Sequence, residues 1–189
     1  VAEEAIRQTE DKYRNIFENA VEGIFQITDD GQYISANPAL ARIYGYESAE
    51  ELIANLTNIW QQLYVLPNRR ADFIGLMQQN DAVSGFESQV YRQDGKIIWI
   101  AENVRAVRDP SGELLYYEGS VEDITVRKVT QEALRYQQQQ SEQLLLNILP
   151  GPIAERLKQQ PQNTIADSFA EVTVLFADIV NFTQISSHT

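Results

Sequence analysis

Residues 124–149 contain neither glycine nor proline and are rich in glutamine and leucine. Because glycine and proline are the residues that most strongly interrupt helices, this stretch can form one continuous helix. Sequence full of turn signals precedes it, and the break Pro150-Gly151-Pro152 follows it. We therefore expect a strand-rich part, a helical connector at 124–149, and a further part after the break.

The connector carries a line of residues suited to pairing with a second copy of the chain. Its first members, spaced by three, four and three positions as in a coiled coil, are Val126, Val129, Ala133 and Tyr136. Gln140, Leu144 and Ile148 continue the line at steps of four, a change of phase that locally unwinds a supercoil. We interpret the connector as a dimeric signalling helix; the alternative is a surface helix with a leucine-rich end.

A second amphipathic helix is predicted at residues 1–20. Small and apolar residues recur there at alternating steps of four and three, with Ile6 and Tyr13 among them. This face could fold back onto its own domain or pack against the same helix of a partner. In the second arrangement Ile6 and Tyr13 extend the contact of a parallel homodimer.

The region between these helices predicts an α+β domain. Strands are expected where apolar residues alternate between turn signals, at 23–28, 32–36, 85–92, 96–108 and 113–123. Short helices are expected at 39–44, after Ser48, where Glu51 completes a capping box, and at 67–79, where Pro67 suits a first helical turn. Two strands, several helices and three antiparallel strands indicate one sheet with helices covering one face.

Several short motifs in this region resemble those of the PAS sensor family, over residues 10–126. The motifs are Asn37-Pro38-Ala39, Gly45-Tyr46, Tyr91-Arg92-Gln93-Asp94-Gly95, Trp99 and Asp123-Ile124-Thr125. The resemblance implies a five-stranded antiparallel sheet, a pocket between the sheet and its helices, and frequent dimerisation. It also implies that the signal leaves through the helix that follows Asp123-Ile124-Thr125.

Some residues of this domain could line such a pocket, although aromatic residues on inward faces more often form plain core packing. They are Phe25, Tyr44, Trp60, Phe73, Met77 and Trp99. The chain has no cysteine, which disfavours a covalent flavin, and its one histidine, His188, lies far from the domain, which disfavours haem. We therefore predict neither haem nor covalent flavin here.

After the break, residues 150–166 are expected to form a short amphipathic helix and a polar linker. Residues 172–176 are apolar and β-branched, as in a buried strand, and Asp178 follows at the end of that strand. A carboxylate at this position can bind a hard cation with help from neighbouring carbonyls, or can simply form a turn.

Residues 176–183 resemble the first metal motif of class III nucleotidyl cyclases, and 146–157 resemble the transducer segment before it. The resemblance implies that 168–189 begin an α/β cyclase domain, in which Asp178 and the Ile179 carbonyl hold Mg²⁺ or Mn²⁺ and ATP is the substrate. The remaining catalytic residues would lie beyond Thr189, so this chain alone is expected to be inactive. The likeness is greatest to bacterial PAS-bearing adenylate cyclases.

The net charge of −12 disfavours binding to nucleic acid or to an anionic membrane surface, and no apolar run is long enough to span a bilayer. We therefore expect a cytoplasmic protein. One rival interpretation is the input module of a sensor histidine kinase, but the connector contains no phosphoacceptor histidine. A second rival interpretation is a free-standing dimerisation module, but it gives no role to residues 172–182.

Overall fold

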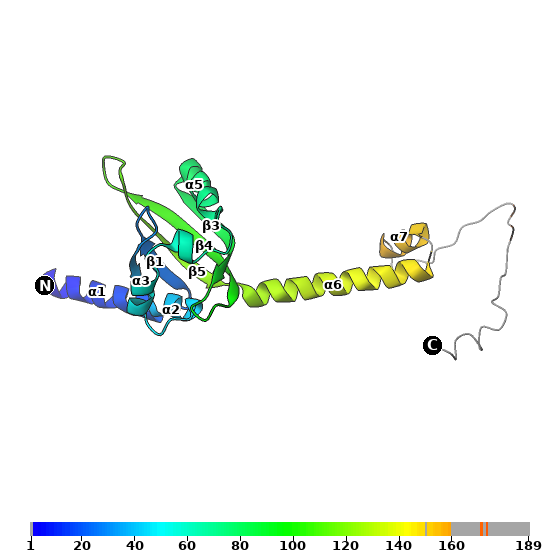
Figure 1. Cartoon of the computed structure of the whole chain (residues 1–189), viewed down its shortest axis with the longest axis horizontal. Helices are drawn as coiled ribbons and strands as arrows, with labels where there is room; N and C mark the ends of the chain where they lie inside the picture. Colours follow the sequence, from blue (N-terminus) through cyan, green and yellow to red (C-terminus); the bar gives the residue numbers. More distant parts are fainter. Residues whose placement is uncertain (1, 150, 160–170, 172, 174–189) are drawn as a thin grey trace. The chain divides into compact units, whose positions relative to one another are not determined.

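The computed structural model describes residues 2–149, 151–159, 171 and 173, and it divides into two compact units, Val1–Arg135 and Tyr136–Thr189. The first unit holds a five-stranded sheet and the helices around it (Figure 1). This confirms the predicted α+β class. The long helix α6 (Thr125–Ile148) crosses the boundary between the units.

All neighbouring strands of the sheet are antiparallel, and their order is β2-β1-β5-β4-β3. The strands are β1 (Gly23–Ile27), β2 (Tyr33–Ala36), β3 (Ala82–Tyr91), β4 (Ile97–Arg108) and β5 (Leu114–Asp123). Each lies where a strand was predicted, but β3 begins three residues earlier than expected. A register shift between Val83 and Phe86 lets the pairing with β4 continue past Gly85, the expected first residue.

Five helices flank the sheet: α1 (Ala2–Asn19), α2 (Pro38–Tyr44), α3 (Ala49–Asn55), α4 (Ile59–Gln62) and α5 (Arg69–Asn80). Ser48 caps α3 as predicted, since its hydroxyl accepts from the Glu51 N–H at 3.2 Å. The Glu51 carboxylate, however, accepts from the Glu47 N–H rather than from Ser48. The helix expected from Pro67 begins only at Arg69, after Asn68 as its cap residue.

The core lies between the sheet and α2 to α5. Alternate residues of the strands point into it, and those of the helices complete it. The large apolar side chains with almost no exposure are Ile27, Leu40, Tyr44, Leu52, Leu63, Val90, Ile100, Val121 and Ile124. Sheet and short helices thus form the two layers between which a PAS pocket was expected.

Gly119 of β5 tests how tightly this sheet is packed. A Cβ there would lie 2.2 Å from the Asn103 carbonyl oxygen and 3.1 Å from the Phe25 ring, so the backbone would have to shift. We expect Gly119→Ala to lower the free energy of unfolding by about 2 kcal/mol, measured by urea denaturation.

Gly75 provides the matched control, because it lies inside α5 and a Cβ there meets no atom within 4 Å. Gly75→Ala should raise the free energy of unfolding by about 0.5–1 kcal/mol through better helix propensity. Equal effects of the two substitutions would contradict the packing argument.

In the second unit, α6 continues to Ile148 and α7 (Gly151–Gln159) follows. Lys158 of α7 forms an ion pair with Glu142 of α6. The two helices are separate, as predicted, although α7 begins at Gly151, which lies within the expected break Pro150-Gly151-Pro152. The strand predicted at 172–176 lies outside the described residues. Among the helices that the structure does describe, none is long and apolar enough to cross a membrane.

Candidate functional site

A buried carboxylate lies in the core of the first unit. Glu102 of β4 is only 4% exposed, because it shares the inward face of its strand with Ile98, Ile100 and Val104. The Tyr64 hydroxyl donates to it, with its oxygen 2.8 Å and 3.0 Å from the two carboxylate oxygens. Burial raises the pKa of Glu102 to about 7, although the Tyr64 hydrogen bond and the Arg69 charge act in the opposite direction.

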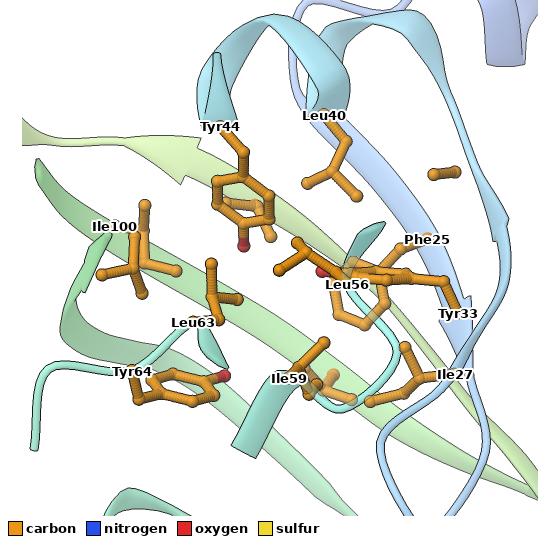
Figure 2. Packing of buried hydrophobic residues seen from close by; sticks show 14 of the residues in the cluster. Phe25, Ile27, Tyr33, Leu40, Tyr44, Leu56, Ile59, Leu63, Tyr64 and Ile100 are labelled. Carbon is orange, nitrogen blue, oxygen red and sulfur yellow. The ribbon is translucent and has the colours of Figure 1, made fainter. Parts of the chain in front are cut away.

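Three tyrosines surround this carboxylate, and with it they form what we call the tyrosine–glutamate cluster: Tyr33, Tyr44, Tyr64 and Glu102. In Figure 2 the three hydroxyl oxygens, from β2, α2 and the segment after α4, point toward the interior of the packed side chains. Burial, followed by neighbouring charges, raises the pKa of all three tyrosines, so their hydroxyls stay protonated. The cluster is therefore a set of neutral donors around one titratable carboxyl.

Two buried polar atoms near this cluster lack hydrogen-bond partners within the described residues: the Tyr44 hydroxyl and the Trp60 indole Nε1. The Tyr44 hydroxyl lies near that of Tyr33 but makes no hydrogen bond of acceptable geometry with it. Unpaired buried donors are rare, because each loses its hydrogen bonds with water. These two groups could bind the acceptor atoms of a water molecule or of a small polar ligand.

The structure brings five of the six predicted pocket residues into this core. Phe25, Tyr44, Trp60, Phe73 and Met77 are buried, and the rings of Trp60 and Phe73 are 5.2 Å apart. Trp99 does not join them, so its predicted place in the pocket was wrong. Ile98 and Ile100 point inward, and Trp99, between them in the strand, points to the other face. There it is half-buried, with the Lys128 ammonium 4.8 Å from its ring centre.

The predicted signalling motif forms the junction between the sheet and α6. Ile124 is buried, and its N–H donates to the Trp99 carbonyl at 2.9 Å. The Thr125 hydroxyl accepts from the Trp99 N–H at 3.0 Å, and the Asp123 carboxylate accepts from the Thr125 N–H at 2.9 Å. The first turn of α6 is therefore held by hydrogen bonds to β4, next to the core.

The predicted dimer seam is exposed in the single chain. Ile6, Tyr13, Val126, Val129 and Tyr136 are each about 60–80% exposed, and Ala133 is also exposed. The predicted metal ligands Asp178 and Ile179 lie outside the described residues. Within the described part of the chain, no three carboxylate or histidine side chains are grouped as a metal site.

Sequence reasoning missed Tyr33, Tyr64 and Glu102. The signal for Glu102 was present, since a glutamate at an inward position of an alternating strand must be buried or break the pattern. Tyr64 gave no such signal, because it lies in an irregular segment and pairs with Val90 through an isolated bridge.

Comparison with known proteins agrees with this architecture. The chain is 59% identical over 49 residues, 26% of its length, to an adenylate cyclase of Mycobacterium tuberculosis, and 29% identical over 133 residues, 67% of its length, to the probable diguanylate cyclase DgcE of Escherichia coli. It spans about a tenth of the length of each relative, since the matches cover 11% of both.

Among solved structures, a sensory box histidine kinase/response regulator of Burkholderia thailandensis superimposes with a TM-score of 0.51 at 21% identity. That match covers 70% of this chain and 98% of the other, and at such low identity it shows the fold alone. The PAS domain profile matches residues 21–126, more than half of the chain. With its five-stranded antiparallel sheet, its helix-covered core and the Asp123-Ile124-Thr125 junction to α6, the chain belongs to the PAS domain family.

Proposed function

We propose that this chain is the sensor and dimerisation region of a class III nucleotidyl cyclase, with adenylate cyclase favoured over guanylate cyclase. The parent enzyme would convert ATP to cyclic AMP and pyrophosphate, and the chain alone would be inactive. The observation that carries the proposal is the continuous 24-residue helix α6, which follows the PAS domain after Asp123-Ile124-Thr125 and precedes the cyclase-like sequence at 176–183 along the chain. The 49-residue likeness to an adenylate cyclase supports the same direction.

The length and exposure of α6 favour a second copy of the chain as its partner. None of its 24 residues is buried, and its seam includes Val126, Val129, Leu144 and Ile148, each at least 60% exposed. A helix gains most of its stability from packing its apolar face, so an unpaired helix of this kind is only marginally stable in water. A parallel homodimer would bury this seam.

The N-terminal helix offers a second contact for the same dimer. Tyr13 and Phe17 stack at 6.0 Å and line a groove of about 470 Å³ together with Ile24 and Asn103 on the outer face of the sheet. Ile6 and Ile16 of α1 stay exposed beside it. Two copies that contact each other both through α1 and along the seam of α6 would lie parallel.

We expect the purified chain to sediment as a dimer at micromolar concentration. Ile6→Asp and Val129→Asp should each weaken association at least tenfold, because each places a charge in an apolar seam. Gln138→Asp is the control, since Gln138 lies on the opposite side of α6 from the seam. Monomeric wild-type chain in analytical ultracentrifugation would contradict the dimer, and unchanged mass of both seam variants would relocate its interface.

The metal site of the parent remains a prediction. The Asp178 carboxylate and the Ile179 carbonyl are oxygen donors of the kind that Mg²⁺ and Mn²⁺ prefer, and the ions would stabilise the charge of the phosphates. No haem or covalent flavin is proposed for the PAS core, because the described core residues include neither histidine nor cysteine.

The alternative function is the input module of a sensor histidine kinase. Its PAS domain and helix would have the same layout, but residues 125–149 contain no histidine to accept a phosphate. The cyclase assignment is therefore the stronger of the two.

The test of the proposed function uses the full-length parent protein. Residues are inserted or deleted one at a time between Tyr136 and Leu144, where the seam changes phase. Cyclic AMP production should rise and fall with the heptad position of each change, because each residue rotates the downstream helix by about 100°. Activity that is indifferent to phase would remove α6 as the output path, and absent cyclase activity in the parent would overturn the function itself.

A further inference from the structure

Two consecutive residues of β3 point to opposite faces of the sheet and contact different elements. Ser88 is 2% exposed and faces the core, whereas Glu87 lies on the outer face. The Glu87 carboxylate pairs with Arg127 at 3.3 Å and with Lys128, both in the first turn of α6. Lys128 also lies over the Trp99 ring, so these residues hold the start of α6 on the sheet. We call this contact the Glu87 latch.

Arg69 of α5 binds the same two residues through hydrogen bonds, and we call this contact the Arg69 grip. Its guanidinium donates to the Ser88 hydroxyl at 3.0 Å and 3.1 Å and to the Glu87 backbone carbonyl at 2.8 Å. The guanidinium also lies 3.9 Å from the centre of the Phe86 ring and pairs with Asp72 at 2.9 Å. Arg69 therefore holds the backbone of Glu87, and the side chain of Glu87 in turn holds the first turn of α6.

Arg69 is also the cation whose charge acts on Glu102. Phe86, which stacks on Arg69, lies opposite Glu102 in the β3–β4 register. Tyr64 donates to the carboxylate directly, and the charge of Arg69 acts on it through space across Phe86, without a direct hydrogen bond or ion pair between the two side chains. Within the described part of the chain, the other groups that act on the carboxylate are the neutral Tyr33 of β2 and Tyr44 of α2. An ionised Glu102 would add an attraction that helps to hold the mostly buried guanidinium in place. With a neutral Glu102, Arg69 would be held by its other contacts alone and would leave its position more often.

We propose that the charge of Glu102 controls the Arg69 grip on β3 and, through it, the Glu87 latch on α6. With Glu102 ionised, Arg69 stays bound to Glu87 and Ser88 and the first turn of α6 is held on the sheet. With Glu102 neutral, because of a proton or of a core ligand that masks its charge, the grip loosens and the latch opens more often. Arg69 is then a positioning residue, and the latch is the two-state element that the coupling needs.

This inference deepens the proposed function, since it rests on α6 as the output helix, but it is tested without any cyclase activity. The probes are two backbone amides: Ile124, whose N–H donates to Trp99, and Lys128, whose N–H donates to Ile124. Their hydrogen exchange is followed by NMR at pH 8 in the wild-type chain and in variants. The fixed pH keeps the intrinsic exchange rates the same.

We expect Glu102→Gln and Arg69→Met each to speed exchange at both amides at least fivefold. The double variant should exchange no faster than either single variant, since both act through one grip. Arg70→Met is the matched control, because Arg70 is the exposed neighbour on α5 and should leave both amides unchanged.

A faster exchange in Arg69→Met alone, with Glu102→Gln like the wild type, would show that Arg69 is merely structural and would overturn the coupling. Trp99 emission gives a second readout in a Trp60→Phe background, where it reports the position of Lys128. Its pH titration should vanish in Glu102→Gln, with His188→Gln present throughout to remove the chain's one histidine. A titration that survives Glu102→Gln would also overturn the proposal.

Discussion

Asn37→Ala is expected to lower the free energy of unfolding by about 4 kcal/mol. Asn37 is fully buried, and its side chain uses its whole hydrogen-bonding capacity. Its oxygen accepts from the Ile24 N–H at 2.9 Å and from the Leu40 N–H at 3.0 Å. Its amide group donates to the Phe17 and Glu22 carbonyls, each at 3.0 Å.

These four bonds join the end of α1, the start of β1 and the first turn of α2 at one point. Alanine would remove the cap of α2, worth about 1 kcal/mol, and would leave buried backbone groups unpaired at about 1–3 kcal/mol for each. The measurement is urea denaturation followed by circular dichroism.

Asn58→Ala is the matched control, because Asn58 caps α4 through one bond only, to the Gln61 N–H at 3.2 Å. Its expected cost is about 1 kcal/mol. If the two variants lose equal stability, Asn37 acts only as a helix cap and does not join the three elements.

The strands and their turns could be predicted from the sequence because local chemistry specifies them. Gly95 and Gly112 both adopt positive φ, 79° and 89°, in the turns that join β3 to β4 and β4 to β5. The Asp109 carboxylate accepts from the Ser111 and Glu113 N–H groups, which fixes the second turn. Such signals act within a few residues, so they are legible without the fold.

Other features could not be predicted because they depend on distant partners. The helix α4 has only four residues, too few to show a helical period, and it stays in place through contacts of Ile59 and Trp60 with the core. The Arg69 grip joins α5 to β3, and the Glu87 latch joins β3 to α6. In each case the two ends lie at least 18 residues apart in sequence, and only the folded sheet brings them together.

Trp99 shows how one error at the site arose. Its size and aromatic character favoured a pocket position, but the alternation of β4 decides the face, and Ile98 and Ile100 already occupy the inward positions. The same alternation places Glu102 inward, against the usual preference of glutamate for solvent. Strand parity was therefore the better guide to this site than residue type.

The stability of the chain is expected to fall as pH rises from about 5 to about 8, because of Glu102. Burial raises the pKa of this carboxyl from 4.5 to about 7, so between these values the folded chain binds a proton that the unfolded chain has released. Binding of protons to the folded state stabilises it, and this stabilisation is complete below about pH 4.5 and is lost as pH rises through about 7. The shift corresponds to about 3 kcal/mol.

Glu102→Gln should remove this loss. Glutamine has nearly the shape of the neutral acid, can accept the Tyr64 hydrogen bond and carries no charge to desolvate. The variant should resemble the wild type near pH 5 and exceed its free energy of unfolding by about 2–3 kcal/mol at pH 8, as measured by urea denaturation at each pH. Glu113→Gln is the control, since Glu113 is exposed and the substitution should leave the pH dependence unchanged.

A gain in stability at pH 8 together with a looser α6 in the same variant would be an informative pair of results. Ionised Glu102 would then lower the stability of the core while it keeps the first turn of α6 bound to the sheet. Such opposing effects keep two states of a sensor close in free energy. Parallel pH profiles in the wild type and Glu102→Gln would mean that the carboxyl is hydrated and close to its ordinary pKa. In that case Tyr64 and Glu102 would be a polar contact of the core and nothing more.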